Sequence, residues 1–287
     1  MQTIFCAVPK HCAPAMLFKR LRNAFRFGSR HSPSLRGVTN AEVARWAAVQ
    51  QVAIVPQAKD GHFDLGGDLH GRPWRLECGP AARDYVQGLE LRGRADMNAD
   101  PDAAVMVLNR ALLESLEGLA YEAITDTLQT TVNEDLPEEI RWLAMYEEVS
   151  WPGLPASFRQ HFAVVAEHAE TAQRWVQAPL VSQLLDIAES EDTDHERALS
   201  PVLLMLVRGK VYLRMEHTRR TLAEVAYATH ALLVAAQSAA QHVVPVQMPP
   251  DAQLPSDEDG AGQGAMTDAS LPGYGAPGRA RATSDAT

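Results

Sequence analysis

Four side chains that could bind a metal ion lie within nine residues of the chain: His62, Asp64, Asp68 and His70. On an unbroken strand they would share one face, and two imidazoles with two carboxylates suit Zn²⁺, Mn²⁺ or Fe²⁺. The solvent face of an amphipathic strand shows the same alternation. His62 and His70 would also lie roughly 26 Å apart at about 3.3 Å per residue. We therefore expect a solvent face without a cofactor, unless Gly66 and Gly67 fold the strand over.

A second candidate site is a group of arginines on the predicted N-terminal sheet: Arg72, Arg75, Arg92 and Arg94. Arg92 and Arg94 alternate with Leu89 and Leu91, so we expect them on the opposite face of their strand. Guanidinium groups bind carboxylates and phosphates well, and an anionic ligand or the acidic surface of a partner could use them. Cross-strand pairing with Asp64, Glu77 and Glu90 explains them equally well.

The third candidate is a basic amphipathic segment at residues 16–27. Its contact residues would be Phe18, Lys19, Arg20, Arg22, Phe25 and Arg26. Phe18, Leu21 and Phe25 have helical spacing, and such a helix can lie on an anionic membrane or contact an acidic protein surface. The chain's own acidic body is an equal alternative. An Arg-rich, acid-free stretch also fits a mitochondrial presequence, and Met16 is an alternative start to Met1.

The other candidate catalytic or metal-binding residues do not form a complete motif. Cys6, His11 and Cys12 lack a fourth ligand, and Cys78 alternates with apolar residues as a buried thiol does. No G-x-S-x-G elbow or phosphate-binding glycine pattern occurs. The remaining histidines, His217 among them, are scattered, and we expect them to be structural or exposed.

Charge divides the 287-residue chain unevenly. Residues 1–50 carry a net charge of +7, residues 51–245 carry −13, and residues 246–287 carry −4. The overall −10 disfavours general nucleic-acid binding. No apolar run approaches the roughly 18 residues of a membrane-spanning helix, and three cysteines cannot form a disulfide framework.

These differences in charge and composition along the chain predict that it has three parts. Residues 1–38 form a basic arm and linker, residues 39–245 form one folded body, and residues 246–287 form a tail. The tail is rich in Pro and Gly and poor in large apolar residues, so we expect it to be disordered.

Alternating patterns predict an antiparallel meander between Gly61 and Leu108, including a strand over 85–96 and a buried strand over 103–108. Asn109 should cap a helix that runs to about 128. The segment 138–149 suits either a strand or a helix, and its bulky aromatics at period two favour a strand. Residues 161–167 suggest a short strand, followed by a helix over 171–189 that Pro179 breaks or kinks.

The clearest pattern lies near the C-terminal end of the body. Residues 202–207 are uniformly apolar, and an alternating strand follows the turn Arg208-Gly209-Lys210. This predicts a hairpin whose first strand is buried on both faces, followed by a helix over 219–242. We therefore expect an α+β fold, with a largely antiparallel sheet made of the N-terminal meander and this C-terminal hairpin, covered by helices.

Composition and pattern favour a binding or regulatory protein of the cytoplasm, with an unknown protein as its partner. Two alternatives stay open. One is an enzyme that acts on a small anionic substrate over the arginine-bearing sheet face, and the other is a scaffold that residues 16–27 hold at the inner face of a membrane. Lysine makes up only four of the 26 basic residues, a bias typical of GC-rich bacterial genes.

Overall fold

One antiparallel sheet organises the chain. The computed structural model describes residues 37–59, 61–125, 137–191 and 200–245. Within them nine strands lie in the order β1-β2-β3-β4-β9-β8-β5-β7-β6. The strands are β1 (Ala53–Pro56), β2 (Phe63–Leu69), β3 (Arg72–Pro80), β4 (Leu89–Asp96), β5 (Val105–Asn109), β6 (Glu147–Glu148), β7 (Phe162–Ala166), β8 (Val202–Val207) and β9 (Lys210–Glu216). The predicted hairpin is present, and the α+β fold class is confirmed. The predicted meander is present only as far as β4, because β5, which it was expected to include, pairs with β7 and β8 instead.

The hairpin β8–β9 joins two parts of the sheet that are distant in sequence. Strand β9 pairs with β4, the last strand of the meander, while β8 pairs with β5. Every residue of β8 is buried, as its unbroken apolar sequence predicts. Strand β9 alternates between buried and half-buried residues, because only one of its faces lies against the helices.

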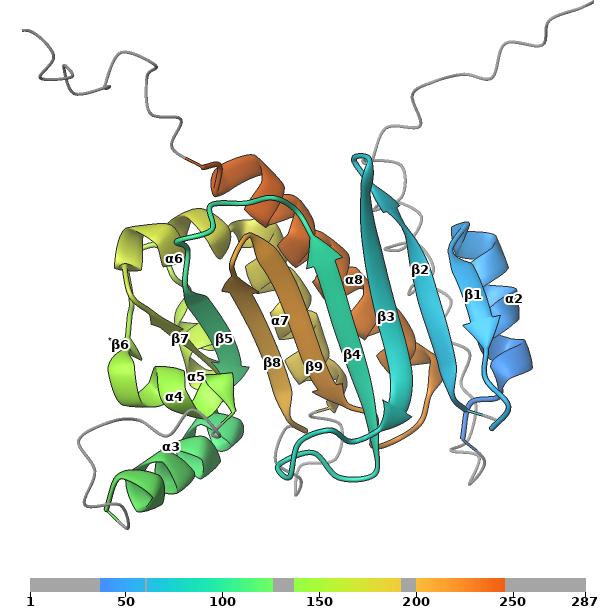
Figure 1. Cartoon of the computed structure of the whole chain (residues 1–287), viewed down its shortest axis with the longest axis horizontal. Helices are drawn as coiled ribbons and strands as arrows, with labels where there is room; N and C mark the ends of the chain where they lie inside the picture. Colours follow the sequence, from blue (N-terminus) through green and yellow to red (C-terminus); the bar gives the residue numbers. More distant parts are fainter. Residues whose placement is uncertain (1–36, 60, 126–136, 192–199, 246–287) are drawn as a thin grey trace, which may run out of the picture. The chain divides into compact units, whose positions relative to one another are not determined.

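Seven helices accompany the sheet in the described part of the chain. They are α2 (Asn40–Gln50), α3 (Arg110–Thr125), α4 (Glu138–Met145), α5 (Ala156–His161), α6 (Ala169–Trp175), α7 (Ala178–Glu191) and α8 (Leu222–His242). The side chains of Thr39 and Glu42 form a capping box at the start of α2, and Thr221 and Glu224 form another at α8. In Figure 1 the ribbon of α8 passes behind β3 and β4.

The two faces of the sheet are covered to different extents. One face carries the larger apolar core, to which α2, α5, α6, α7 and α8 contribute buried side chains. The smaller core lies on the other face, where α3 and α4 cover β5, β7 and β8, and the half-buried Tyr212 of β9 packs against it. The described helices therefore leave the second face of β2, β3 and β4 uncovered.

The prediction of a strand over 138–149 was wrong. Residues 138–145 form α4, in which Ile140 and Trp142 are buried against the smaller core. Tyr146 follows the helix, and only Glu147 and Glu148 form a strand. The aromatic spacing of two misled the prediction, because Trp142 and Tyr146 contact each other edge to face across one helical turn.

Smaller differences concern the ends of elements. The strand expected over 85–96 begins at Leu89, and the segment before it is a loop. Asn109 is the last residue of β5, and its side-chain oxygen accepts a hydrogen bond from the backbone of Val202 at 2.9 Å. The break expected at Pro179 falls just before α7, so this proline lies in the first helical turn, where its missing N–H costs little. Strand β1 was not predicted.

Candidate functional site

The uncovered side of the sheet presents a charged surface that we call the arginine face. It consists of Asp64, Arg75, Glu77, Glu90, Arg92, Arg94, Asp96, Tyr212 and Arg214 on β2, β3, β4 and β9. A hollow of about 430 Å³ lies over this surface, with Arg75, Arg92, Arg94, Tyr212 and Arg214 among its lining residues. The arginine face is therefore both open and concave.

Strand register places these side chains in two adjacent rows. Arg75 lies opposite Arg94, which lies opposite Tyr212. In the next row Glu77 lies opposite Arg92, which lies opposite Arg214. Directly opposite residues on one face stand about 4.5–5.5 Å apart at Cβ, so the side chains of each row are close neighbours.

Most of the arginines are paired with carboxylates of the same face. The Arg75 guanidinium lies 3.2 Å from Asp64 and 2.8 Å from Glu77, and Arg92 lies 3.2 Å from Glu77. Arg214 forms an ion pair with Glu90, a fully buried carboxylate. The cross-strand pairing expected from the sequence is thus present and neutralises much of the local charge.

Arg94 differs from its neighbours. In the part of the chain that the structure describes, no acidic side chain lies within ion-pair distance of its guanidinium. The guanidinium lies instead over the ring of Tyr212, 5.9 Å from the ring centroid, which is within the range of a cation–π interaction. Arg94 is exposed and Tyr212 is half-buried. The guanidinium charge of Arg94 is therefore open to solvent without a described carboxylate beside it, and the Tyr212 ring supports it from below.

Arg72 does not join the other three predicted arginines. Arg72 alternates in step with the buried Trp74 and Leu76, so it belongs to the other face of β3. It is the first residue of that strand, next to the hairpin turn and opposite Leu69. Arg92 and Arg94 share one face of β4, and the register of β3 with β4 brings Arg75 to the same face. Arg72 therefore serves below as a control position outside the arginine face.

The four metal-ligand candidates are not brought together. Asp64 pairs with Arg75, and Asp68 accepts a hydrogen bond from the Gly71 backbone at 2.6 Å in the hairpin turn. His70 lies in that turn with a positive φ of 58°, whereas His62 is buried at the other end of β2. Among the described residues no group of three or more His, Cys, Asp or Glu side chains could hold a metal ion.

The basic segment 16–27 and its contact residues lie outside the described residues, as do Cys6, His11 and Cys12. The same holds for the predicted tail at 246–287. In the described part, no helix combines the length and the apolar character that crossing a membrane would require.

Sequence reasoning missed Tyr212 and Arg214 as part of this surface. Their alternation with apolar residues was visible, but it placed them only on the outer face of a hairpin. Their position beside Arg94 and Arg92 follows from the pairing of β4 with β9, which joins residues more than a hundred positions apart. No local pattern in the sequence carries this information.

Comparisons with known proteins add little. The chain matches no protein-family model and no curated protein sequence. Among solved structures, the crystal structure of the mycobacterial trehalose monomycolate transport factor A is similar with a TM-score of 0.37 and 9% identity. The match covers 81% of this chain and 98% of that chain. Similarity at this level supports no statement about function.

Proposed function

We propose that this chain is a non-catalytic binding protein whose arginine face binds an acidic segment of a protein partner. The observation that carries the proposal is the exposed Arg94 guanidinium on Tyr212, without an acidic partner in the described residues. Arginine and tyrosine are among the residue types most enriched where protein interfaces gain their affinity. A cytoplasmic location is part of the proposal, because the free thiol of Cys78 is usual in reducing compartments.

The chemistry of the face favours binding over catalysis. Guanidinium groups stay protonated and cannot act as bases. Asp64, Glu77 and Glu90 are each held by an arginine, so they are not positioned to accept a proton from a substrate. What the arginine face offers is charge, hydrogen-bond donors and one aromatic surface.

The shape of the arginine face favours a protein segment over a small anion. The hollow spans β3, β4 and β9 and lies open on the sheet surface, with Glu77 and Asp96 among its lining residues. These carboxylates would repel a free anion but leave room for a partner that places one acidic side chain at Arg94. A small ligand would instead need a pocket that encloses most of its surface.

Binding of a labelled peptide to the full chain tests this proposal. The probe is a fluorescent peptide in which glutamates alternate with serines, and its matched control carries glutamine in place of glutamate. We expect the glutamate peptide to bind about tenfold more tightly, because an interfacial charge pair contributes more than 1 kcal/mol. Arg94→Ala and Tyr212→Leu should each remove most of this preference, and fluorescence anisotropy measures the affinities.

Arg72→Ala is the matched control, since it removes an arginine from β3 outside the arginine face. It should bind the glutamate peptide as the wild type does. Equal affinity of wild type and Arg94→Ala would overturn the proposal. Competition by free glutamate or inorganic phosphate as strong as that of the peptide would also overturn it, in favour of a small anionic ligand.

A further inference from the structure

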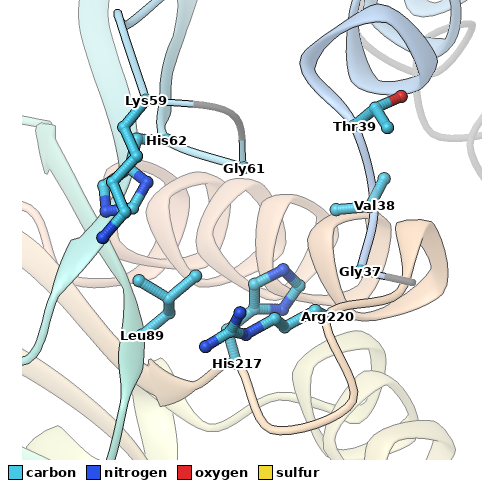
Figure 2. A pocket seen from close by; sticks show the side chains of 9 residues that line it. All are labelled: Gly37, Val38, Thr39, Lys59, Gly61, His62, Leu89, His217 and Arg220. Carbon is cyan, nitrogen blue, oxygen red and sulfur yellow. The ribbon is translucent and has the colours of Figure 1, made fainter. Parts of the chain in front are cut away.

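A second concave site lies away from the arginine face. It is a pocket of about 370 Å³ that residues from four separate segments line: residues 37–39; Lys59, Gly61 and His62; Leu89 at the start of β4; and His217 with Arg220. Figure 2 shows His62 and Lys59 bordering this space from one segment, and His217 and Arg220 from another. Two imidazoles and two basic side chains thus surround one pocket.

The segments are fixed by backbone hydrogen bonds. The N–H of Val38 donates to the carbonyl of Arg220 at 2.6 Å, and the N–H of His217 donates to the carbonyl of Leu89 at 2.8 Å. The N–H of Gly61 donates to Asn40 Oδ1 at 3.0 Å. The pocket is therefore formed by the fold itself rather than by loosely placed loops.

His62 is buried, but its ring makes no hydrogen bond within the described part of the chain. Only 5% of its surface is exposed, and within the described chain neither ring nitrogen has a hydrogen-bond partner. Leaving such a group unsatisfied costs about 1–3 kcal/mol, so an unpartnered buried imidazole calls for an explanation. A ligand that hydrogen-bonds to the ring would supply one.

His217 is held in a defined orientation. Its Nδ1 lies 2.8 Å from Glu224 Oε2, while the described residues offer its Nε2 no hydrogen-bond partner. Glu224 also accepts hydrogen bonds from the backbone N–H groups of Arg219 and Thr221. Burial raises the pKa of Glu224, but these contacts outweigh it and hold the pKa below the usual range. An ionised Glu224 beside Nδ1 orients the ring, whose nitrogens are both screened from water.

Two cationic side chains border the pocket in the described part of the chain. Lys59 and Arg220 are both exposed at its edge, and no carboxylate of the described residues lies within ion-pair distance of either. Two described carboxylates lie nearby: Glu224 contacts His217 and two backbone N–H groups, and Glu42 accepts hydrogen bonds from Thr39. Two imidazoles could suggest a metal ion, but two cationic side chains and the lack of a third ligand oppose that.

We propose that this pocket binds a phosphate group, either as free phosphate or as the phosphate of a small metabolite. Lys59 and Arg220 would supply charge-assisted hydrogen bonds from the edge, and a ring N–H of His62 would donate from inside. The His62 nitrogens are screened from water, so binding requires its ring to turn toward the anion. The volume is within the range of small-molecule sites and exceeds what phosphate alone fills.

Calorimetric titration of the full chain with inorganic phosphate and with glycerol 3-phosphate tests this proposal. Both should bind, and tighter binding of the ester would identify a phosphorylated metabolite as the ligand. Equal affinity would identify free phosphate. Lys59→Ala combined with Arg220→Ala should weaken phosphate binding by about tenfold or more. Arg72→Ala is the matched control and should leave phosphate binding unchanged.

His62→Leu separates a ligand-binding role from a structural one. Because the ring has no partner in the described fold, we expect this variant to be at least as stable as the wild type without phosphate. The rise in Tm that phosphate causes in the wild type should disappear. Ring resonances of His62 and His217 should shift in NMR spectra when phosphate is added to the wild type.

Three results would overturn the proposal. The first is the absence of phosphate binding together with unchanged histidine resonances. The second is phosphate binding that Lys59→Ala with Arg220→Ala leaves unchanged. The third is a loss of stability in His62→Leu without phosphate, which would make the imidazole a structural group.

Discussion

Gly93 and Leu232 define how closely α8 approaches the sheet. A Cβ atom at Gly93 would lie 2.8 Å from Leu232 Cδ2 and 3.0 Å from Leu213 Cβ. Leu232 is fully buried in the larger core, so its side chain has little room to move. The missing side chain of Gly93 therefore lets α8 lie directly on β4, opposite the arginine face.

Gly93→Ala should consequently destabilise the fold. Overpacking of a buried contact typically costs about 1–3 kcal/mol, which exceeds the gain of about 0.4–1 kcal/mol from a less flexible unfolded chain. Urea unfolding of the wild type and the variant measures the difference. Gly118→Ala is the matched control, because Gly118 is exposed within α3 and a Cβ there meets nothing within 4 Å. That variant should gain up to about 1 kcal/mol; equal effects of the two substitutions would contradict the close approach.

Strand β8 should be the most sensitive strand to truncation. Leu204 is fully buried in the larger core, and its neighbours Leu203 and Met205 lie in the smaller one. Leu204→Ala should lower the free energy of unfolding by about 2–5 kcal/mol through lost burial and a new cavity. Asp68→Ala, which alters only an exposed turn, should cost far less. Thermal unfolding compares the two, and similar losses would show that the turn at Asp68 is as important as the core.

The sequence contains the local part of this architecture. The apolar composition of residues 202–207 is enough to predict a strand buried on both faces. The alternation in β3 and β4 predicts that Arg75, Arg92 and Arg94 point away from the apolar side of their strands. What it cannot contain is pairing over long distances. The approach of β9 to β4, which adds Tyr212 to the arginine face, depends on the complementarity of whole strands.

The same limit applies to the pocket. His62 was expected on a solvent face, and His217 was one of several scattered histidines. Each is ordinary in its local context, and only the folded chain brings residues 62 and 217 to one cavity. A buried imidazole without a partner is a property of three-dimensional surroundings, so no spacing in the sequence indicates it.

Cys78 should resist alkylation in the native protein. Burial raises the pKa of its thiol to about 12, although Arg220 and Arg92 oppose the shift. The Sγ atom also lies 3.2 Å from the carbonyl oxygen of Gly61. The thiolate is the reactive form, so iodoacetamide at neutral pH should modify Cys78 only after unfolding. Mass spectrometry of peptides from native and urea-treated protein measures this, and rapid native modification of Cys78 would contradict its burial.

Glu139 should make stability depend on acid pH. It is buried on α4, where it accepts hydrogen bonds from Arg83 and from the Tyr85 hydroxyl at 2.7 Å. Burial raises the pKa of Glu139, but hydrogen bonds from Arg83, its own backbone N–H and Tyr85 outweigh this effect and lower the pKa below its usual value. A carboxyl with a lowered folded-state pKa stabilises the fold above its unfolded pKa of about 4.3. This contribution is lost as the pH falls through the folded-state pKa.

Glu139→Gln should therefore be less stable than the wild type at neutral pH, by about 1–3 kcal/mol for the lost charged hydrogen bonds. The difference should shrink steadily as the pH falls below about 4, because the wild-type carboxyl then becomes neutral as well. Urea midpoints of both proteins across this range measure the effect. Glu138→Gln is the matched control. The Glu138 carboxylate makes only a 3.5 Å contact with the exposed Arg208, so this substitution should cost little stability. A difference between Glu139→Gln and wild type that stays constant from neutral to acid pH would show that Glu139 contributes through its shape and not through its charge.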